Sequence, residues 1–384
     1  MFETDEQVQL REAVSALGRK YGHEYYVGRA KTGGHTDELW SEAGKLGYLG
    51  VNLPVEYGGG GGGITELSIV CEELAAAGCP LLMLVVSPAI AGTILARHGT
   101  SEQRETYLTG IADGTHKVAF AITEPEAGSN FHRLGTLARR DGDEWILNGR
   151  KCFISGVDTA QSVLVVARIE DSATGKLQPA LFVVPTDAPG LTRSVIEMEI
   201  VSPEKQWLLY LDDVRVPASA LVGGSTEAGL PALFTGLNPE RITVAAMACG
   251  NARYALGRAA SYVSSRTVWG RPIGTHQGIA HPLAHAQIQV ELARLATAKA
   301  AALYDAGRDV DAGIAANMAK YAATEAAWLA VDTSIQAHGG NGMTTEYGVA
   351  TMLGGVRAGR IAPVTREMIL NFVAQHVLGQ QKSY

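Results

Sequence analysis

The spacing of apolar and polar positions divides the chain into three stretches of different periodicity. From about residue 4 to 115 apolar residues recur at helical spacing, as Leu10, Val14 and Leu17 do with polar residues among them. Thr4 lies three residues before Gln7, an arrangement typical of the capping box at a helix start. The same pattern predicts further helices at 64–77 and 88–98.

Six consecutive glycines, Gly58–Gly63, precede the helix predicted at 64–77. Such a run has large backbone freedom, so we expect a flexible loop. A phosphate-binding P-loop would require Lys-Ser or Lys-Thr after it, and this chain has neither there.

From about residue 117 to 222 the pattern changes to short β-rich runs separated by turn residues. The runs are Val118–Ile122, Val163–Ile169, Ala180–Val184 and Leu208–Val216. The turn signals are Asp141-Gly142-Asp143, the hairpin-like Asn148-Gly149, and Ala188-Pro189-Gly190. Strands at this spacing predict a small barrel or sandwich rather than βαβ units.

From about residue 229 the chain is helical again and rich in alanine, with candidate helices at 242–264, 280–306, 310–338 and 366–378. Small side chains let helices pack closely, so we expect a four-helix bundle. The predicted fold is therefore of the α+β multidomain class. Its domains would be an N-terminal helical domain (1–116), a central β-barrel or sandwich (117–228) and a C-terminal four-helix bundle (229–384).

Composition and charge exclude several function classes. The chain is 46% hydrophobic and 18% charged with a net charge of −7, which gives no basic surface for nucleic acid. Its cysteines lack metal-site spacing, so we expect reduced, buried thiols and no metal: Cys71, Cys79, Cys152 and Cys249. The acidic N-terminus is unlike a signal peptide, and the apolar stretch at 80–95 is too interrupted to span a membrane. We therefore expect a cytoplasmic protein.

Two segments of the β region could contact a flat, polar ring. Residues 121–130 follow a strand and carry the hydroxyl groups of Thr123 and Ser129 with free backbone N–H groups, although an ordinary turn explains them equally well. In the second segment, Phe153 and Ser155 would share one face of a strand. A core role is the more frequent one for a strand Phe.

Two segments of the helical region are further candidates. Pro239 suits the first turn of a helix, so Glu240 would lie near a helix N-terminus, where a carboxylate also simply stabilises the dipole. Residues 266–277 and the turn at 336–342 could approach a ligand through glycine backbone, but Gly339-Gly340 is also a normal helix end. His338 alone is more often structural than catalytic.

Taken together, these segments resemble the acyl-CoA dehydrogenase family over nearly the whole chain. The motifs that carry the resemblance are Leu53–Gly59, the Thr-Glu-Pro-x-Ala-Gly-Ser loop at 123–129, Asn-Gly-x-Lys at 148–151, the stretch 266–277, and Gln-x-x-Gly-Gly-x-Gly at 336–342. Each motif is weak alone, and five in the right order are a strong signal.

The resemblance implies that FAD is clamped between the β module and the bundle. The flavin would be lined by Phe120, Ile122, Thr123, Gly128, Ser129, Phe153, Ile154 and Ser155. Further FAD-binding positions would be Arg266, Trp269, His276, Gln277, Gln336, His338, Gly339, Gly340, Thr365 and Glu367. Arg266, Gln277 and the segment 336–340 would reach FAD across a subunit boundary, which implies a homo-oligomer, a dimer or a tetramer.

The resemblance also implies the substrate and its contacts. Ser129 would reach the thioester, and Asn238 and Arg241 fall on positions that bind the CoA portion. The expected reaction is α,β-dehydrogenation of an acyl-CoA to the trans-2-enoyl-CoA, with hydride transfer to flavin N5. An electron-transfer flavoprotein would be the acceptor.

Family members place the catalytic glutamate at one of two sites. One corresponds here to Pro363, which cannot accept a proton, and the other corresponds to Glu240, as in isovaleryl-CoA dehydrogenases. We therefore expect Glu240 to be the base. Other departures from the family pattern are Gly354-Gly355 in place of Arg-Asp and Asn130 in place of Asp.

These departures leave two alternatives open. One is a non-catalytic FAD- or CoA-binding subunit of a heteromeric dehydrogenase. The other is an enoyl-thioester reductase or a dehydrogenase of acyl groups held on a carrier protein.

Overall fold

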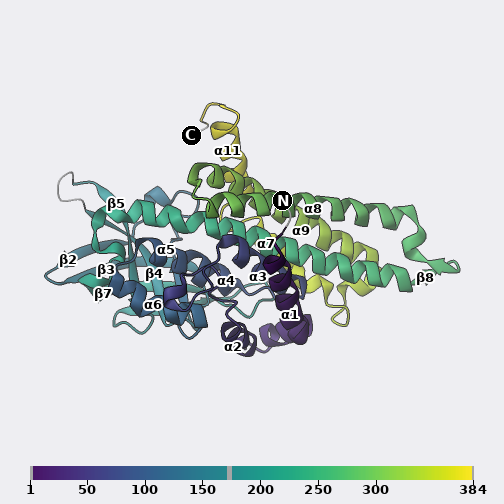
Figure 1. Ribbon diagram of the computed structural model, residues 1–384, viewed down its shortest axis with the longest axis horizontal. Coiled ribbons are helices and arrows are strands. Elements are labelled where there is room, and N and C mark those ends of the chain that lie inside the picture. Colours follow the sequence, from purple (N-terminus) through teal and green to yellow (C-terminus); the bar gives the residue numbers. More distant parts are fainter. Residues whose placement is uncertain (1–2, 171–174, 383–384) are drawn as a thin grey trace.

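The structure, a computed structural model, describes residues 3–170 and 175–382, and its large β-sheet lies toward one end of the molecule while the helices extend to the other end (Figure 1). The N-terminal region consists of α1 (Asp5–Lys31), α2 (Asp37–Lys45), α3 (Ile64–Ala76), α4 (Leu82–Leu84), the π-helical stretch Val85–Gly92, α5 (Thr93–His98) and α6 (Ser101–Asp113). The predicted capping box is present, because the amide of Gln7 donates to the Thr4 hydroxyl and the Thr4 amide donates to the Gln7 side chain. The predicted helix at 64–77 is confirmed as α3. Residues 88–98 are helical as predicted, but they comprise part of the π-helical stretch followed by α5.

The glycine run 58–63 is held more firmly than its composition predicts. Three of its amides donate hydrogen bonds of 2.9 Å to carbonyl oxygens of residues 50–53. A Cβ on Gly59 would lie 2.2 Å from the Leu53 carbonyl oxygen, and one on Gly63 would lie 2.4 Å from the Asp305 carboxyl group. The segment is a loop, as predicted, but its glycines serve close backbone packing. Asp305 also caps α3 by accepting the amide of Ile64 at 2.8 Å.

The central region forms one curled sheet whose seven strands in the described part of the chain run in the order β1-β4-β2-β3-β7-β6, with β5 on the other edge of β4. The strands are β1 (Val118–Ala121), β2 (Leu137–Asp141), β3 (Glu144–Ser155), β4 (Ser162–Glu170), β5 (Leu177–Pro185), β6 (Leu191–Ile196) and β7 (Gln206–Pro217). Strands β1 and β2 pair with β4 in parallel, and the remaining pairs are antiparallel.

Strand β1 separates two hydrophobic cores. Val118 and Phe120 pack into the helical core, whereas Ala119 and Ala121 pack into the interior of the curled sheet. This alternation follows from the two-residue period of a strand, and β4 and β5 repeat it. The sheet thereby becomes a shared wall between the β module and the helices, and that wall positions the site.

Two of the three turn signals are confirmed and one is wrong. Residues 141–144 form the β2–β3 hairpin, and 188–191 form the turn before β6. Asn148-Gly149, in contrast, lies inside β3 at a register shift against β7. The Asn148 side chain exchanges hydrogen bonds of 2.9 Å with the side chain and the amide of Asp213, so the bulge replaces a turn.

The C-terminal region is dominated by three long helices that lie along one another (Figure 1). Its elements are α7 (Gly229–Ser265), the small hairpin β8 (Thr267–Val268) and β9 (Arg271–Pro272), α8 (Gln277–Asp305), α9 (Asp309–His338), α10 (Leu353–Gly359) and α11 (Arg366–His376). The fourth predicted helix is present as α11 and projects from the three long helices. The predicted order of helices, β module and helices is confirmed.

The first predicted bundle helix begins earlier than expected, at Gly229 rather than at 242. Pro239 therefore lies inside α7 and not in its first turn, and Glu240 is not at a helix N-terminus. A proline inside a helix leaves the carbonyl four residues earlier without its donor. Here that carbonyl belongs to Thr235, and the Tyr304 hydroxyl of α8 donates to it at 3.0 Å.

A cluster of buried charges fastens the N-terminal region to the bundle. Glu72 and Glu73 on α3 are buried and pair with arginines from three helices: Arg11 of α1, Arg253 of α7 and Arg294 of α8. The four cysteines are free and buried, as predicted. Among the described residues, none of the helices has the length and apolar character that crossing a membrane requires. The same part of the chain holds no cluster of potential metal ligands.

Candidate functional site

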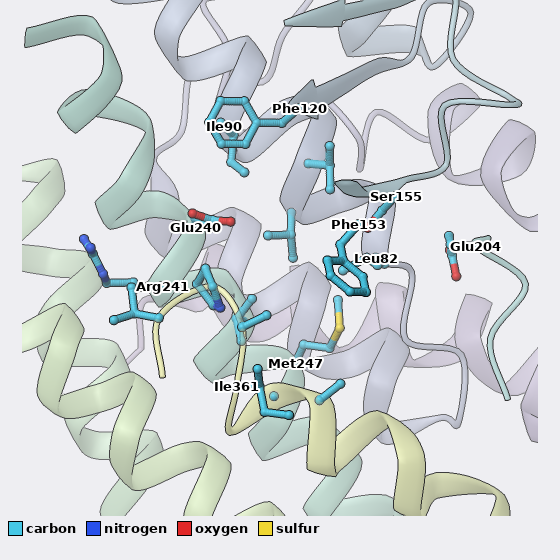
Figure 2. Close-up of a pocket in the computed structure, with 18 of the residues that line it drawn as sticks. Leu82, Ile90, Phe120, Phe153, Ser155, Glu204, Glu240, Arg241, Met247 and Ile361 are labelled. Carbon is cyan, nitrogen blue, oxygen red and sulfur yellow. The ribbon is translucent and has the colours of Figure 1, made fainter. Parts of the chain in front are cut away.

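A cavity of about 2320 Å³ lies where the sheet, α7, the segment before α11 and the helices α4 and α5 meet (Figure 2). Typical pockets for one small ligand hold roughly 300–1,000 Å³. The cavity is therefore large enough for a cofactor together with a substrate. The predicted site residues of the β module and of α7 all line it, and so does Thr365 before α11: Phe120, Ile122, Thr123, Gly128, Ser129, Phe153, Ile154, Ser155, Asn238, Glu240, Arg241 and Thr365.

A buried ion pair between Lys151 and Glu124 fixes the loop that follows β1. The Lys151 ammonium donates to a Glu124 carboxylate oxygen at 2.7 Å and to the Ile122 carbonyl at 3.0 Å. The other bonds of Glu124 go to backbone amides, including that of Thr136 at 3.0 Å. Lys151 is 0% exposed. This pair holds the loop that presents Thr123 and Ser129 to the cavity.

Burial and the ion pair together set the pKa values of Lys151 and Glu124. Burial lowers the pKa of Lys151 to about 8, although the neighbouring carboxylate opposes that shift. Burial raises the pKa of Glu124, but the hydrogen bond and charge of Lys151 outweigh this and hold that pKa below its ordinary value. Both groups are therefore charged at neutral pH.

A second irregularity of β3 turns an aromatic ring toward the cavity. The register against β7 shifts between Lys151 and Ile154, and Phe153 between them has a φ of 57°. A bulky residue in this left-handed region is a rare, strained conformation of the kind that clusters at ligand sites. Phe153 is consequently 56% exposed on the cavity side while Ile154 is buried. Phe153 and Ser155 both line the cavity while Ile154 between them packs into the core of the sheet, so the predicted shared side of the strand is kept despite the register shift.

Glu240 projects from α7 into the cavity (Figure 2). Within the described residues its carboxylate accepts no hydrogen bond, and burial raises its pKa to about 7 against the opposing charges of Arg241 and Lys320. A carboxyl group with a pKa near neutrality can exchange a proton with a bound molecule.

Arg241, the next residue of α7, holds the end of the cavity nearest Asn238. Its Nη1 donates to the Asn238 side chain at 3.1 Å and to the Leu237 carbonyl at 3.3 Å, and its Nε is buried with no partner in the described structure. Burial lowers the pKa of Arg241. This corner offers hydrogen-bond donors to an incoming polar group.

The predicted residues at the other end of the bundle do not reach this cavity within one chain. These residues are Arg266, Trp269, His276, Gln277, Gln336, His338, Gly339 and Gly340. Glu367 lies in the first turn of α11, beside the cavity-lining Thr365, but it does not line the cavity itself. The β8–β9 hairpin that carries Trp269 lies at the opposite end of the molecule from the sheet (Figure 1), and the Trp269 side chain is 86% exposed. Arg266 and His338 line a separate cavity of about 260 Å³. His338 is buried, stacks on Tyr262 and bonds to the Ser334 carbonyl at 2.7 Å, as a structural histidine does.

The sequence pattern does not reveal the apolar residues of the cavity. Leu82, Val85, Ile90, Met247 and Ile361 line the cavity. They come from α4, from a π-helical stretch, from α7 and from a loop, so no single period connects them. Lys151 was also missed as a site residue, although a lone Lys between strand residues of a β-rich run was the available signal.

Models of the N-terminal, middle and C-terminal domains of acyl-CoA dehydrogenase match residues 4–115, 119–207 and 227–378. Acyl-CoA dehydrogenase FadE12 of Mycobacterium tuberculosis is 62% identical over 383 residues, which are 100% of this chain and 98% of that protein. The chain belongs to the acyl-CoA dehydrogenase family.

Solved structures of acyl-CoA dehydrogenases share the whole architecture. A glutaryl-coenzyme A dehydrogenase in complex with glutaryl-CoA superimposes with a TM-score of 0.94 at 29% identity, covering 100% of this chain and 98% of that one. A glutaryl-CoA dehydrogenase from Mycobacterium smegmatis in complex with FADH2 gives a TM-score of 0.88 at 27% identity, covering 100% and 98%. The protein is therefore an FAD-dependent enzyme of this family.

The cavity suits FAD on its own evidence. The strained bulge exposes the Phe153 ring, which a flat ring system can cover, and the hydroxyl-bearing residues Thr123, Ser129 and Ser155 of the β module and Thr365 before α11 line the same cavity. The individual FAD contacts, including those expected from the far end of a second chain, stay predictions.

Proposed function

We propose that this acyl-CoA dehydrogenase converts an acyl-CoA to the trans-2-enoyl-CoA with Glu240 as the catalytic base. The observation that supports this most is the isolated Glu240 carboxyl group in a large cavity, with its pKa raised to about 7 by burial. A base with a pKa near the working pH combines a sufficient ionised fraction with proton affinity. At neutral pH and above, the ionised Glu240 would remove the α-proton.

The reaction balances over two carbons of the substrate. The α-proton goes to a Glu240 carboxylate oxygen and leaves its bonding electron pair on the α-carbon. The hydride leaves the β-carbon with its own electron pair, and the pair on the α-carbon forms the new π bond between the two carbons. FAD, when bound, accepts the hydride. The chain's own part is to hold the substrate, to exclude water and to take the proton.

Pro363 supports the assignment of the base to α7. It lines the cavity at the second of the two family positions for the glutamate, where it supplies neither a carboxyl group nor an N–H. The thioester carbonyl therefore needs other donors, and Ser129 on the facing loop is the proposed protein contact. Asn238 and Arg241 are proposed to hold the CoA portion.

The cavity wall favours an apolar acyl chain. Leu82, Val85, Ile90 and Met247 line the cavity that Glu240 enters, and burial of apolar surface contributes about 25 cal/mol per Å². We therefore propose a hydrocarbon acyl group rather than a charged one.

Anaerobic titration of the purified protein with acyl-CoAs of different length and branching tests this function. We expect the oxidised flavin absorbance to bleach with some of them. A yellow protein that acyl-CoAs leave unbleached would contradict the proposal and would favour the reverse reaction, a carrier-bound substrate or a non-catalytic subunit. Acyl-pantetheine-protein thioesters and enoyl-CoA with reduced enzyme then separate those outcomes.

We also propose that the enzyme is a homo-oligomer. Ile288, Leu292 and Leu295 form an apolar stripe on α8 that is 55–58% exposed in the single chain. Such a stripe marks an association surface, and α8 begins at Gln277, one of the residues expected to reach FAD in a second chain. An electron-transfer flavoprotein as acceptor and a cytoplasmic location remain proposals from family resemblance.

Leu292→Asp is expected to shift the assembly to a lower mass and to reduce the bound FAD, because a charge in the stripe opposes its burial. Light scattering and the flavin-to-protein absorbance ratio measure the two effects. Leu46→Asp is the matched control, because Leu46 is similarly exposed at 51% but lies at the end of α2. An unchanged mass for Leu292→Asp would contradict the assignment of this interface.

A further inference from the structure

The cavity wall that faces Glu240 is tied to α9 by charged side chains. Residues 361–365, between α10 and α11, all line the cavity. At the two ends of this segment Arg360 and Arg366 contact Glu325 of α9, with Nε–Oε1 2.8 Å for Arg360 and Nη1–Oε1 3.5 Å for Arg366. In its middle, the Lys320 ammonium donates to the Val364 carbonyl at 2.6 Å.

Lys320 is a costly residue to bury. Its side chain is 0% exposed, and in the described structure the Val364 carbonyl is the hydrogen-bond acceptor of its ammonium. An unpaired buried charge is strongly unfavourable, so such a lysine is retained only where a nearby negative charge or dipole compensates it. Lys320 does not line the cavity itself and acts through its neighbours.

The charged groups around Lys320 connect it to the base. Glu240 and Arg241 face it from α7, Glu325 from α9 and Glu367 from α11. Burial and Arg241 lower the pKa of Lys320 to about 8 while the three carboxyl groups oppose the shift, so the ammonium is mostly charged at neutral pH. In return, its charge lowers the pKa of Glu240 against the effect of burial.

We propose that Lys320 is a positioning residue of the dehydrogenation site. It fixes the Val364 carbonyl, and with it the 361–365 wall of the cavity, and its positive charge favours the ionised form of the Glu240 carboxyl group. The proposal rests on the proposed function of Glu240.

Two variants distinguish the hydrogen bond of Lys320 to Val364 from the effect of its charge on Glu240. Lys320→Met removes both the donor and the charge, whereas Lys320→Gln keeps a donor and removes the charge. Lys45→Met, at an exposed lysine of α2, is the control. The measurement is the anaerobic rate of flavin reduction per bound FAD, followed across pH with the best acyl-CoA of the titration.

In the wild type the rate is expected to rise with pH through about 7, as Glu240 ionises. Both Lys320 variants should shift this limb to higher pH by about one unit, since loss of a nearby positive charge raises the pKa of a carboxyl group. Lys320→Met should also lower the maximal rate by about 10- to 100-fold, because small displacements of reacting groups cost up to that much. Lys320→Gln should lose less.

The proposal would be overturned if the Lys320 variants kept the wild-type pH dependence of flavin reduction and lost activity only in proportion to the FAD they lose. A purely structural lysine gives that result. If neither Lys320 variant folds, Glu325→Gln decides, since its side chain is partly exposed at 28% and it anchors the same wall at both ends. It should slow reduction by about 3- to 10-fold, and a full rate would overturn the proposal. A wild-type enzyme that acyl-CoAs leave unbleached would instead contradict the proposed function itself.

Discussion

Glu240→Gln is expected to lower the rate of flavin reduction by acyl-CoA by about 10³-fold or more, while FAD and acyl-CoA still bind. General-base catalysis contributes about 10²- to 10⁴-fold, and within the described residues Glu240 is the proposed base with no neighbouring carboxyl group in contact to replace it. Gln has the same shape and no charge, so the cavity keeps its volume. Anaerobic rapid mixing with the flavin absorbance as the signal measures the rate.

Glu204→Gln is the matched control. Glu204 lines the same cavity on a different wall (Figure 2), and burial raises its pKa as well. Its oxygen accepts a hydrogen bond of 2.8 Å from Ser202, which is a structural use of the carboxylate. We expect this variant to be reduced at close to the wild-type rate. Full activity of Glu240→Gln would exclude Glu240 as the base.

Lys151→Met should have the largest effect on stability, lowering the free energy of unfolding by about 3–5 kcal/mol and releasing FAD. Removing one partner of a buried ion pair leaves the other charge uncompensated, and here Glu124 would remain 6% exposed without its cation. The loop of Thr123 and Ser129 would then lose the hydrogen bond that Lys151 makes to the Ile122 carbonyl. Urea unfolding and the flavin content of the purified protein measure both effects.

The double variant Glu124→Gln with Lys151→Met tests whether the uncompensated charge of Glu124 causes the loss of stability. Without either charge the desolvation cost disappears, so part of the lost stability should return even though a buried hydrogen bond is missing. A double variant that is less stable than Lys151→Met by the full cost of Glu124→Gln would show that the two side chains act independently.

The sequence predicted the architecture well because each region has a clear period. The helices at 64–77, 280–306 and 310–338, and the strands at 118–122 and 163–169, correspond closely to α3, α8, α9, β1 and β4. Each of these elements buries one regular face, and the spacing of apolar residues in the sequence follows that buried face.

The errors lie where tertiary contacts override the local pattern. Pro239 suggested a helix start, but Tyr304 supplies the missing donor and the helix continues through it. Asn148-Gly149 suggested a hairpin, but Asp213 on the neighbouring strand fixes it as a bulge. Glu240 was selected by family resemblance, whereas its elevated pKa depends on the surrounding burial, which no sequence period reveals.

The glycine run at 58–63 has a practical consequence for handling this protein. By composition it is the obvious linker, the place where an engineer would insert a tag or expect a protease to cut. Its amides are instead bonded to residues 50–53, and Asp305 from the end of α8 closes against its last glycine. The segment packs the first helical region against the bundle, so it is among the least suitable sites in the chain for an insertion.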